Sequence, residues 1–251
     1  MKLLLFRRKV LAIIICAAIV FGMFCAVNHP AVMGAAAASR QLPIYCVERD
    51  YPVISLSFDA AWGNEDTQQL IDVLEKYHVK ATFFVVGAWV DKYPESVTAL
   101  FDAGHEVMNH SDDHAHFNSL SAAQIAENIN ACNDKIEAVT GVRPTLFRPP
   151  YGEYDDHVIS TERSMGMEPI QWDVDSLDWK DLSACEITSR VTSRVRSGSI
   201  VLFHNAALHT PEALPGIIEA LIREGYSFVP VSELILTGSY TIDHTGRQSP
   251  A

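Results

Sequence analysis

The sequence predicts a single α/β domain built on parallel strands. From Val53 onward, short apolar runs alternate with segments of helical periodicity, in about seven strand–helix units. This alternation is typical of parallel strands joined by right-handed helical crossovers. The number of units fits either a closed α/β barrel or an open doubly wound sheet. No glycine-rich phosphate loop follows the first strand, which disfavours an open sheet that binds nucleotides.

Start and stop signals delimit most of these elements. Asn64 can cap the first helix, Ser121 and Gln124 form a capping box, and Gly141 ends the long helix that follows. The polar tail, residues 237–251, is expected to be loose. Strands are predicted at residues 53–58, 81–86, 106–109, 145–148, 167–172, 199–203 and 227–229, and helices at residues 65–77, 94–103, 121–140, 155–165, 184–195, 210–224 and 231–236.

The first 40 residues have the pattern of an export segment. Four basic residues precede an uncharged apolar run over residues 10–27, and a stretch of small residues follows at 35–39. The run is just long enough to span a bilayer, so a cleaved signal peptide and a single-pass membrane anchor both stay open. In either case residues 41–251 are expected to form the exported domain.

Charge and cysteine content narrow the classes of partner. The net charge of −12 argues against binding nucleic acid or anionic lipid by charge, and favours a neutral or zwitterionic glycan. Outside the apolar run only Cys46, Cys132 and Cys185 remain. Their odd number and wide spacing exclude a dense disulfide framework and disfavour a cysteine metal site, so free buried thiols are expected. We expect the chain to act as a monomer.

Five side chains suited to acid–base or metal chemistry follow five predicted strands. They are Asp59, His110, Arg148, Asp175 and His204. In a parallel barrel the carboxyl ends of all strands meet on one face, and that face carries the active site. We therefore expect these side chains to lie together.

The residue types suggest two of their roles. His110 and His114 are four apart and could face one cation if the segment is helical, although a surface loop explains this short pattern equally well. His116 is expected to lie outside such a metal site. Asp59 follows a strand expected to be buried on both faces and so needs a partner. Arg148 could pair with it, either as a purely structural ion pair or to hold a general base.

Asp175 and His204 form a second predicted pair. A carboxylate bonded to an imidazole raises its pKa, which favours a protonated histidine that can donate to a leaving group. The alternative is that His204 merely caps the end of a strand. Beside such a polar cluster, aromatic and apolar residues that would otherwise be assigned to the core are expected to line a substrate pocket, namely Trp62, Tyr151, Trp172, Trp179 and Leu202.

Five short motifs occur in order over residues 53–236. They are Ser57-Phe58-Asp59-Ala60, His110-Ser111-Asp112-Asp113-His114, Arg148-Pro149-Pro150-Tyr151-Gly152, Asp175-Ser176-Leu177-Asp178-Trp179 and Leu202-Phe203-His204. Together they resemble the NodB-homology polysaccharide deacetylases, carbohydrate esterase family four. Residues 58–67 are similar to the sporulation-associated PdaB subgroup. The resemblance implies a distorted α/β barrel and a hydrolase that removes N-acetyl groups from cell-wall polysaccharide, peptidoglycan in particular, outside the cytoplasmic membrane or in the spore envelope.

The resemblance also implies roles for single residues. Asp59 matches the catalytic base and Arg148 the arginine that orients it. His204 matches the catalytic acid and Asp175 the carboxylate that tunes this acid.

The remaining matches concern the metal and the acetyl group. His110 and His114 match the histidines that bind a divalent cation, zinc in the first place and cobalt as an alternative. The backbone N–H of Tyr151 matches an oxyanion donor, and Trp179 and Leu202 match walls of the acetyl pocket.

One position departs from the family pattern. The family has two adjacent aspartates in the first motif, the second a metal ligand, and here that position is Ala60. Losing this ligand is expected to weaken metal binding, so a weakly held, different or absent metal all stay open. Water could fill the gap, or one of Asp66, Asp112 and Asp113. The alternative function is a catalytically silent glycan-binding or envelope-assembly protein on the same fold.

Overall fold

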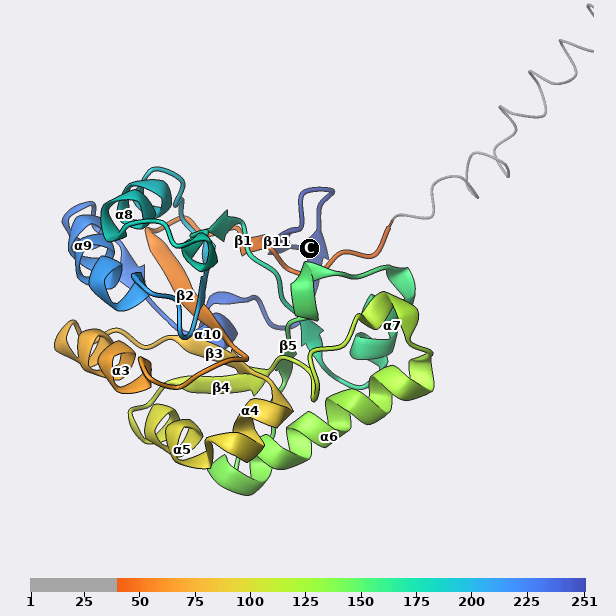
Figure 1. Ribbon diagram of the computed structural model, residues 1–251. Helices are drawn as coiled ribbons and strands as arrows, with labels where there is room; N and C mark the ends of the chain where they lie inside the picture. Colours follow the sequence, from red (N-terminus) through yellow and green to blue (C-terminus); the bar gives the residue numbers. More distant parts are fainter. Residues whose placement is uncertain (1–39) are drawn as a thin grey trace, which may run out of the picture. The chain divides into compact units, whose positions relative to one another are not determined.

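The computed structural model describes residues 40–251, so the predicted export segment lies outside the described residues. Figure 1 shows a curved parallel sheet in which the longest strand is β2 (Val53–Ala60). β9 (Ser227–Phe228) pairs with the start of β2. The main strands are, in spatial order, β6 (Glu168–Pro169), β5 (Leu146–Phe147), β4 (Glu106–Asn109), β3 (Thr82–Val85), β2 (Val53–Ala60), β8 (Ile200–His204) and β7 (Val174–Asp175).

The curved sheet is a barrel that stays open on one side. Within residues 40–251 no pairing joins β6 to β7, so strand pairing does not close the barrel. The predicted distorted barrel is confirmed, because the sheet is curved with helices around its outer side and lacks the two helix layers of a doubly wound sheet (Figure 1). The segment just before β2 lies across this opening: Ile44 N donates to Pro169 O at 2.9 Å, and Val47 N donates to Gly198 O at 2.9 Å. Gly198 has φ +81, and a Cβ there would lie 1.7 Å from Val47 O, so only glycine allows this approach.

Helices cover the outer face of the sheet (Figure 1). The capping box predicted at Ser121 and Gln124 is confirmed, and the helix it begins ends at Gly141 in the left-handed conformation. These helices are α3 (Thr67–Lys76), α4 (Gly87–Lys92), α5 (Pro94–Asp102), α6 (Ala122–Thr140), α7 (Asp156–Ser164), α8 (Ala184–Thr192) and α9 (Thr210–Arg223). The short helix α10 (Val231–Leu234) packs instead with Val53 and Phe84 of the inner face.

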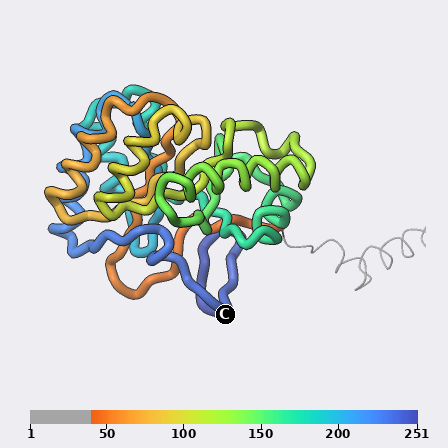
Figure 2. The backbone as a smooth tube through the Cα atoms, turned by 90° about the horizontal axis from the view of Figure 1, so that it is seen from below, coloured from red at the N-terminus to blue at the C-terminus, as the bar shows by residue number. Residues whose placement is uncertain are grey.

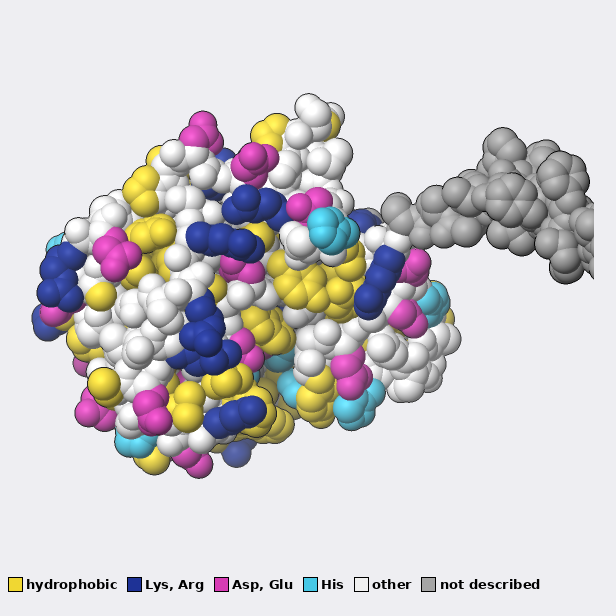
Figure 3. All heavy atoms as spheres, turned by 90° about the horizontal axis from the view of Figure 1, so that it is seen from above, with side chains coloured by type: hydrophobic (Ala, Val, Ile, Leu, Met, Phe, Trp, Pro, Cys, Tyr) yellow, Lys and Arg dark blue, Asp and Glu magenta, His cyan; other side chains and the backbone are white. Residues whose placement is uncertain are grey.

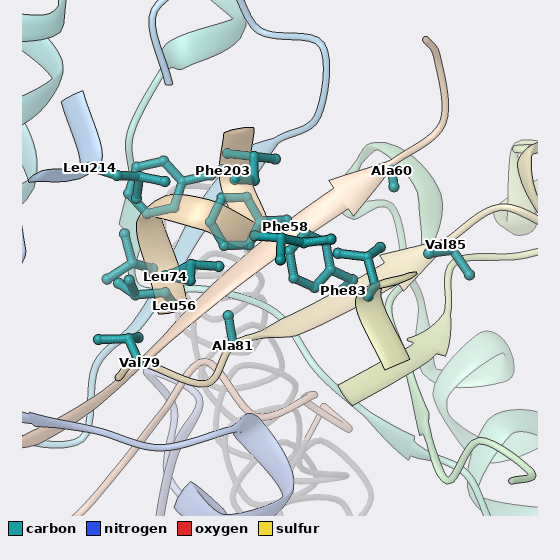
Figure 4. Close-up of a cluster of buried hydrophobic side chains, with 14 of the residues drawn as sticks. Leu56, Phe58, Ala60, Leu74, Val79, Ala81, Phe83, Val85, Phe203 and Leu214 are labelled. Carbon is teal, nitrogen blue, oxygen red and sulfur yellow. The ribbon is translucent and has the colours of Figure 1, made fainter. Parts of the chain in front are cut away.

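Strand β2 separates the hydrophobic core from the site. Its alternate residues Leu56, Phe58 and Ala60 belong to the core cluster between the sheet and the helices, where the Phe58 ring stacks on Phe83 at 4.7 Å (Figure 4). Because side chains alternate along a strand, Ser57 and Asp59 point to the other face, into the barrel. The same alternation places Ala60 on the core side, beside apolar side chains.

Several predicted boundaries differ from the structure. Strand β2 continues through Asp59 to Ala60, because β8 pairs with it as far as Asp59 and β3 pairs with it as far as Ala60. Helix α3 begins at Thr67 after Asp66, so Asn64 is not its cap. The short helix α4 was not predicted, because six residues carry too little periodicity.

The prediction of a loose tail is wrong. Strands β10 (Tyr240–Ile242) and β11 (Arg247–Pro250) form a hairpin, and β11 pairs in parallel with β1 (Cys46–Val47). Figure 2 shows this hairpin beside the start of the described chain. The fully buried Gln248 accepts from Leu236 N at 2.7 Å and donates to Leu236 O at 3.0 Å, so the side chain replaces a strand pairing there.

Two further findings concern thiols and membranes. Cys46 and Cys132 are buried free thiols, as predicted, whereas the free thiol of Cys185 is exposed. Within residues 40–251, no helix has the length and apolar character needed to cross a bilayer.

We expect Gln248→Ala to lower the free energy of unfolding by about 2 kcal/mol, because it leaves the N–H and C=O of Leu236 without partners. Urea denaturation followed by circular dichroism measures this. Ser249→Ala in the same strand is the control and is expected to change stability by less than about 0.5 kcal/mol. Equal stability of the two variants would contradict a stabilising role for the hydrogen bonds between Gln248 and Leu236.

Candidate active site

A cavity of about 410 Å³ opens at the carboxyl ends of β2, β4, β7 and β8. Eight of the nine predicted site residues line it, the exception being Arg148, which is buried beside it. Figure 3 shows the face on which histidine side chains lie in a hollow bordered by hydrophobic ones. The predicted meeting of reactive side chains at one rim of the barrel is therefore confirmed.

Asp59 and Arg148 form the buried ion pair at the base of the site. Arg148 follows β5, and its Nη1 donates to Asp59 Oδ1 at 2.7 Å. Its Nη2 donates to Ser57 Oγ at 2.9 Å and to Gln171 O at 3.2 Å, and the guanidinium lies 4.1 Å from the centroid of the Phe84 ring. Burial raises the pKa of Asp59, but the charge of Arg148 outweighs this and holds the pKa below its usual value. Asp59 is therefore an anion at neutral pH.

His110 is oriented by the same arginine. Its ring Nδ1 lies 2.7 Å from Arg148 O, which fixes the tautomer with the proton on Nδ1 and leaves Nε2 free to accept. Nε2 lies 3.5 Å from Asp59 Oδ2. Burial lowers the pKa of His110, so the ring is neutral and its free nitrogen can bind a cation.

His114 joins His110 through a loop. The helix considered for residues 110–114 does not form, because Ser111 and His114 have φ of 75° and 59°. His114 N donates to Ser111 Oγ at 2.9 Å, and this turn brings the two ring centroids to 5.1 Å. Burial lowers the pKa of His114 to about 4, so this ring too is neutral.

The donor set fits a cation held by two imidazoles. His114 Nδ1 is buried without a hydrogen-bond partner among residues 40–251, as expected of a nitrogen that needs an ion or water. In the same part of the chain no group of three or more His, Cys, Asp or Glu converges on one point. The two histidines could therefore hold a cation with water completing its shell, and the third protein ligand is missing.

None of the substitutes considered for Ala60 lines the cavity. Asp66 Oδ2 accepts from Ala206 N at 2.9 Å, which ties it to the loop after β8. Asp112 pairs with Lys135 Nζ at 2.6 Å. Asp113 Oδ1 accepts from Asn128 Nδ2 at 2.7 Å.

Asp178, and not Asp175, is the hydrogen-bond partner of His204. Asp178 Oδ1 lies 2.8 Å from His204 Nδ1, while its Oδ2 accepts from His204 N at 2.8 Å and from Thr210 Oγ1 at 2.7 Å. Burial lowers the pKa of His204, but the hydrogen bond and charge of Asp178 outweigh this and raise the pKa above its usual value. Asp178 therefore favours the protonated form of His204, which lines the cavity.

The chain reversal after β7 explains why the sequence indicated the wrong carboxylate. Asp175 ends β7, and its Oδ1 accepts from Leu177 N at 2.8 Å. Leu177 has φ of 56°, and this turn carries Asp178 beneath His204. Asp175 lines the cavity without bonding the imidazole. Spacing alone cannot choose between two aspartates in one motif.

The loop at Tyr151 and Gly152 is held in left-handed conformations. Tyr151 has φ of 60°, and its N–H has no acceptor within residues 40–251. Gly152 has φ +67, and a Cβ there would lie 3.0 Å from the Trp172 ring, so glycine is needed both for the turn and for space. The strain leaves one backbone donor beside the cavity, where the resemblance implies an oxyanion donor.

Comparison with known proteins identifies the family. The family described as Polysaccharide deacetylase matches residues 47–170. The peptidoglycan-N-acetylmuramic acid deacetylase PdaC of Bacillus subtilis is 39% identical over 188 residues, covering 75% of this chain and 40% of PdaC. The chitooligosaccharide deacetylase of Bradyrhizobium sp. is 30% identical over 214 residues, covering 77% of this chain and 98% of that protein. The chain belongs to the polysaccharide deacetylase family.

A solved structure supports this family assignment, and it belongs to a protein described as a pseudoenzyme. BA3943 of Bacillus anthracis, described as a CE4 family pseudoenzyme, superimposes with a TM-score of 0.74 at 35% identity, covering 76% of this chain and 68% of that one. This polysaccharide deacetylase chain spans only 38% to 60% of the length of three curated relatives, PdaC among them. The resemblance drawn from the five motifs is confirmed.

We expect Arg148→Met to lower the free energy of unfolding by about 3–5 kcal/mol, because it leaves Asp59 buried without its countercharge. Arg143→Met is the matched control. Arg143 is exposed and pairs with Asp134 and Glu137, so its loss is expected to cost less than about 1 kcal/mol. Thermal and urea unfolding measure the stability of both variants. Equal decreases in the free energy of unfolding would contradict the claim that the buried ion pair matters more than the exposed one.

Proposed function

We propose that this chain is a hydrolase that removes N-acetyl groups from the amino sugars of cell-wall polysaccharide, peptidoglycan in the first place. One observation carries the proposal: a carboxylate paired with an arginine and an imidazole paired with a second carboxylate line the same cavity. Asp59 and His204 are register partners on the neighbouring strands β2 and β8. Their pKa values are shifted apart, Asp59 downward and His204 upward, as a base and an acid require.

The residues divide the hydrolysis of an acetamide between them. Asp59 accepts a proton from the attacking water, whose oxygen bonds to the carbonyl carbon. His204 donates its proton to the amide nitrogen as the C–N bond breaks, so that an amine and acetate leave. The N–H of Tyr151 can bind the developing oxyanion. Trp179 and Leu202 line the same cavity and are the proposed walls for the acetyl methyl.

A divalent cation, zinc or cobalt, would be held by His110 and His114. When bound there it would polarise the carbonyl and lower the pKa of bound water. Because Ala60 supplies no ligand and lies in the core cluster, we expect the affinity to be weak.

The setting of this activity rests on sequence features. The basic and apolar pattern of residues 1–39 supports export, with or without membrane anchoring. The similarity of residues 58–67 to the PdaB subgroup supports a role in sporulation. The similarity to peptidoglycan deacetylases such as PdaC supports peptidoglycan as the substrate.

The proposal is tested by acetate release from purified peptidoglycan, with and without added zinc or cobalt. We expect release by the native chain and a loss of ~10²–10⁴-fold in Asp59→Asn, which removes the base and keeps a hydrogen bond to Arg148. Circular dichroism and metal analysis of both proteins accompany the assay. Undiminished release by Asp59→Asn would refute its role as the base.

A second candidate is a catalytically silent glycan-binding or envelope-assembly protein. Ala60 favours it, because the third metal ligand is absent, and so does the similarity to BA3943. This candidate predicts no acetate release from peptidoglycan or chitin-like oligomers at any metal concentration, together with retained binding of the polymer.

Asp178 and Asp175 are expected to differ in their effect on the pH profile. A raised pKa keeps His204 protonated, so kcat/KM falls as pH rises through that pKa. Asp178→Asn removes the hydrogen-bonded charge and is expected to move this alkaline limb to lower pH. Asp175→Asn is the matched control and is expected to move it less. A larger shift in Asp175→Asn would contradict the assignment of Asp178.

A further inference from the structure

Four rings form a continuous row, and three of them line the cavity. The His116 ring stacks on Tyr151 at 4.3 Å and 11°, Tyr151 meets the edge of His114 at 4.5 Å, and the Trp62 ring lies 5.5 Å from His114. We call these residues, His116, Tyr151, His114 and Trp62, the aromatic row. The proposed mechanism uses His114 and the backbone of Tyr151, and leaves the rings of Trp62, Tyr151 and His116 without a role.

The aromatic row is anchored at its outer end. His116 Nδ1 lies 2.9 Å from Glu153 Oε2, a solvent-exposed contact beside the ring that stacks on Tyr151. Tyr151 is also held in place from the backbone by its left-handed conformation. The row is therefore in place before any ligand arrives, which reduces the entropy lost on binding.

Much of the row is exposed to solvent, including the His116 side chain at its outer end. Trp62 is 64% exposed and Tyr151 is 56% exposed, although both line the cavity. Within residues 40–251 the large exposed aromatic side chains are Trp62, Tyr151, Trp179 and Tyr51, and all but Tyr51 line this cavity. Exposed apolar surface gathered at one site indicates a binding surface.

The cavity is too small to hold more than one sugar unit, so the exposed aromatic surface is available to adjoining units of a polymer. A volume of about 410 Å³ is near the lower end of small-molecule pockets, ~300–1,000 Å³, and suits one sugar unit with its acetyl group. The adjoining units of a polymer must then lie outside it, over the rim. Trp62 and Tyr151 are the rings that the rim presents on the metal side.

We propose that the aromatic row, and Trp62 above all, forms a stacking subsite for the sugar unit next to the one that is deacetylated. The apolar C–H face of a pyranose ring buries against an aromatic face and needs no countercharge, which suits an uncharged glycan. The subsite makes the protein select oligomers over monosaccharides. This inference rests on the proposed function, since it assumes that the cavity receives an amino sugar.

Binding is tested separately from catalysis. The full chain carrying Asp59→Asn is titrated with N-acetylglucosamine as monomer, dimer and pentamer, by calorimetry and by tryptophan fluorescence. We expect Kd to fall with chain length. Trp62→Ala is expected to weaken pentamer binding by about tenfold, with a smaller loss for the monomer, and Trp62→Phe is expected to restore most of it.

Tyr51→Ala is the matched control. Tyr51 is 55% exposed, precedes β2 at the opposite end of the sheet, and does not line the cavity, so its loss should leave Kd unchanged. Equal pentamer affinity in the chains with Trp62 and with Trp62→Ala would overturn the subsite, even where the native chain releases acetate. If the native chain releases no acetate while Trp62→Ala still loses pentamer affinity, the subsite stands and the proposed catalysis fails.

Discussion

The site depends on one buried guanidinium. The side chain of Arg148 neutralises and aims Asp59, while its backbone carbonyl fixes the tautomer of His110. One residue thereby positions both the proton acceptor and one nitrogen of the cation site. A fully buried arginine is costly unless its charge is paired, and the Asp59 carboxylate and the Phe84 face provide the pairing. Burial of this pair therefore links the site to the packing of the barrel interior.

Much of the fold and of the site could be predicted from the sequence, for identifiable reasons. Apolar runs separated by helical periods predict parallel strands, and polar residues directly after those runs predict a shared rim. This reasoning brought Asp59, His110, Arg148 and His204 together correctly. It worked because the position of a residue at a strand end depends on local pattern, which the sequence contains.

The errors arose where geometry depends on loops or on distant partners. Asp178 replaces Asp175 beside His204 because of one left-handed residue, Leu177, which no periodicity reveals. The two histidines meet through a turn and not along a helix. The tail is ordered because Gln248 bonds to Leu236 and β11 pairs with β1, which are contacts between separated segments. Polar composition alone therefore described the tail wrongly.

The two halves of the site differ in how they are supported. Asp59 lies within β2, paired on both sides by β3 and β8, and His204 ends the neighbouring strand. His114 and Tyr151 stand on loops whose backbones adopt left-handed angles. The groups proposed to transfer protons thus belong to paired strands, whereas His114 and Tyr151, which would contact the cation and the glycan, belong to loops. Substitutions at a few loop residues could therefore change the substrate specificity of this protein without changing the strands of the barrel.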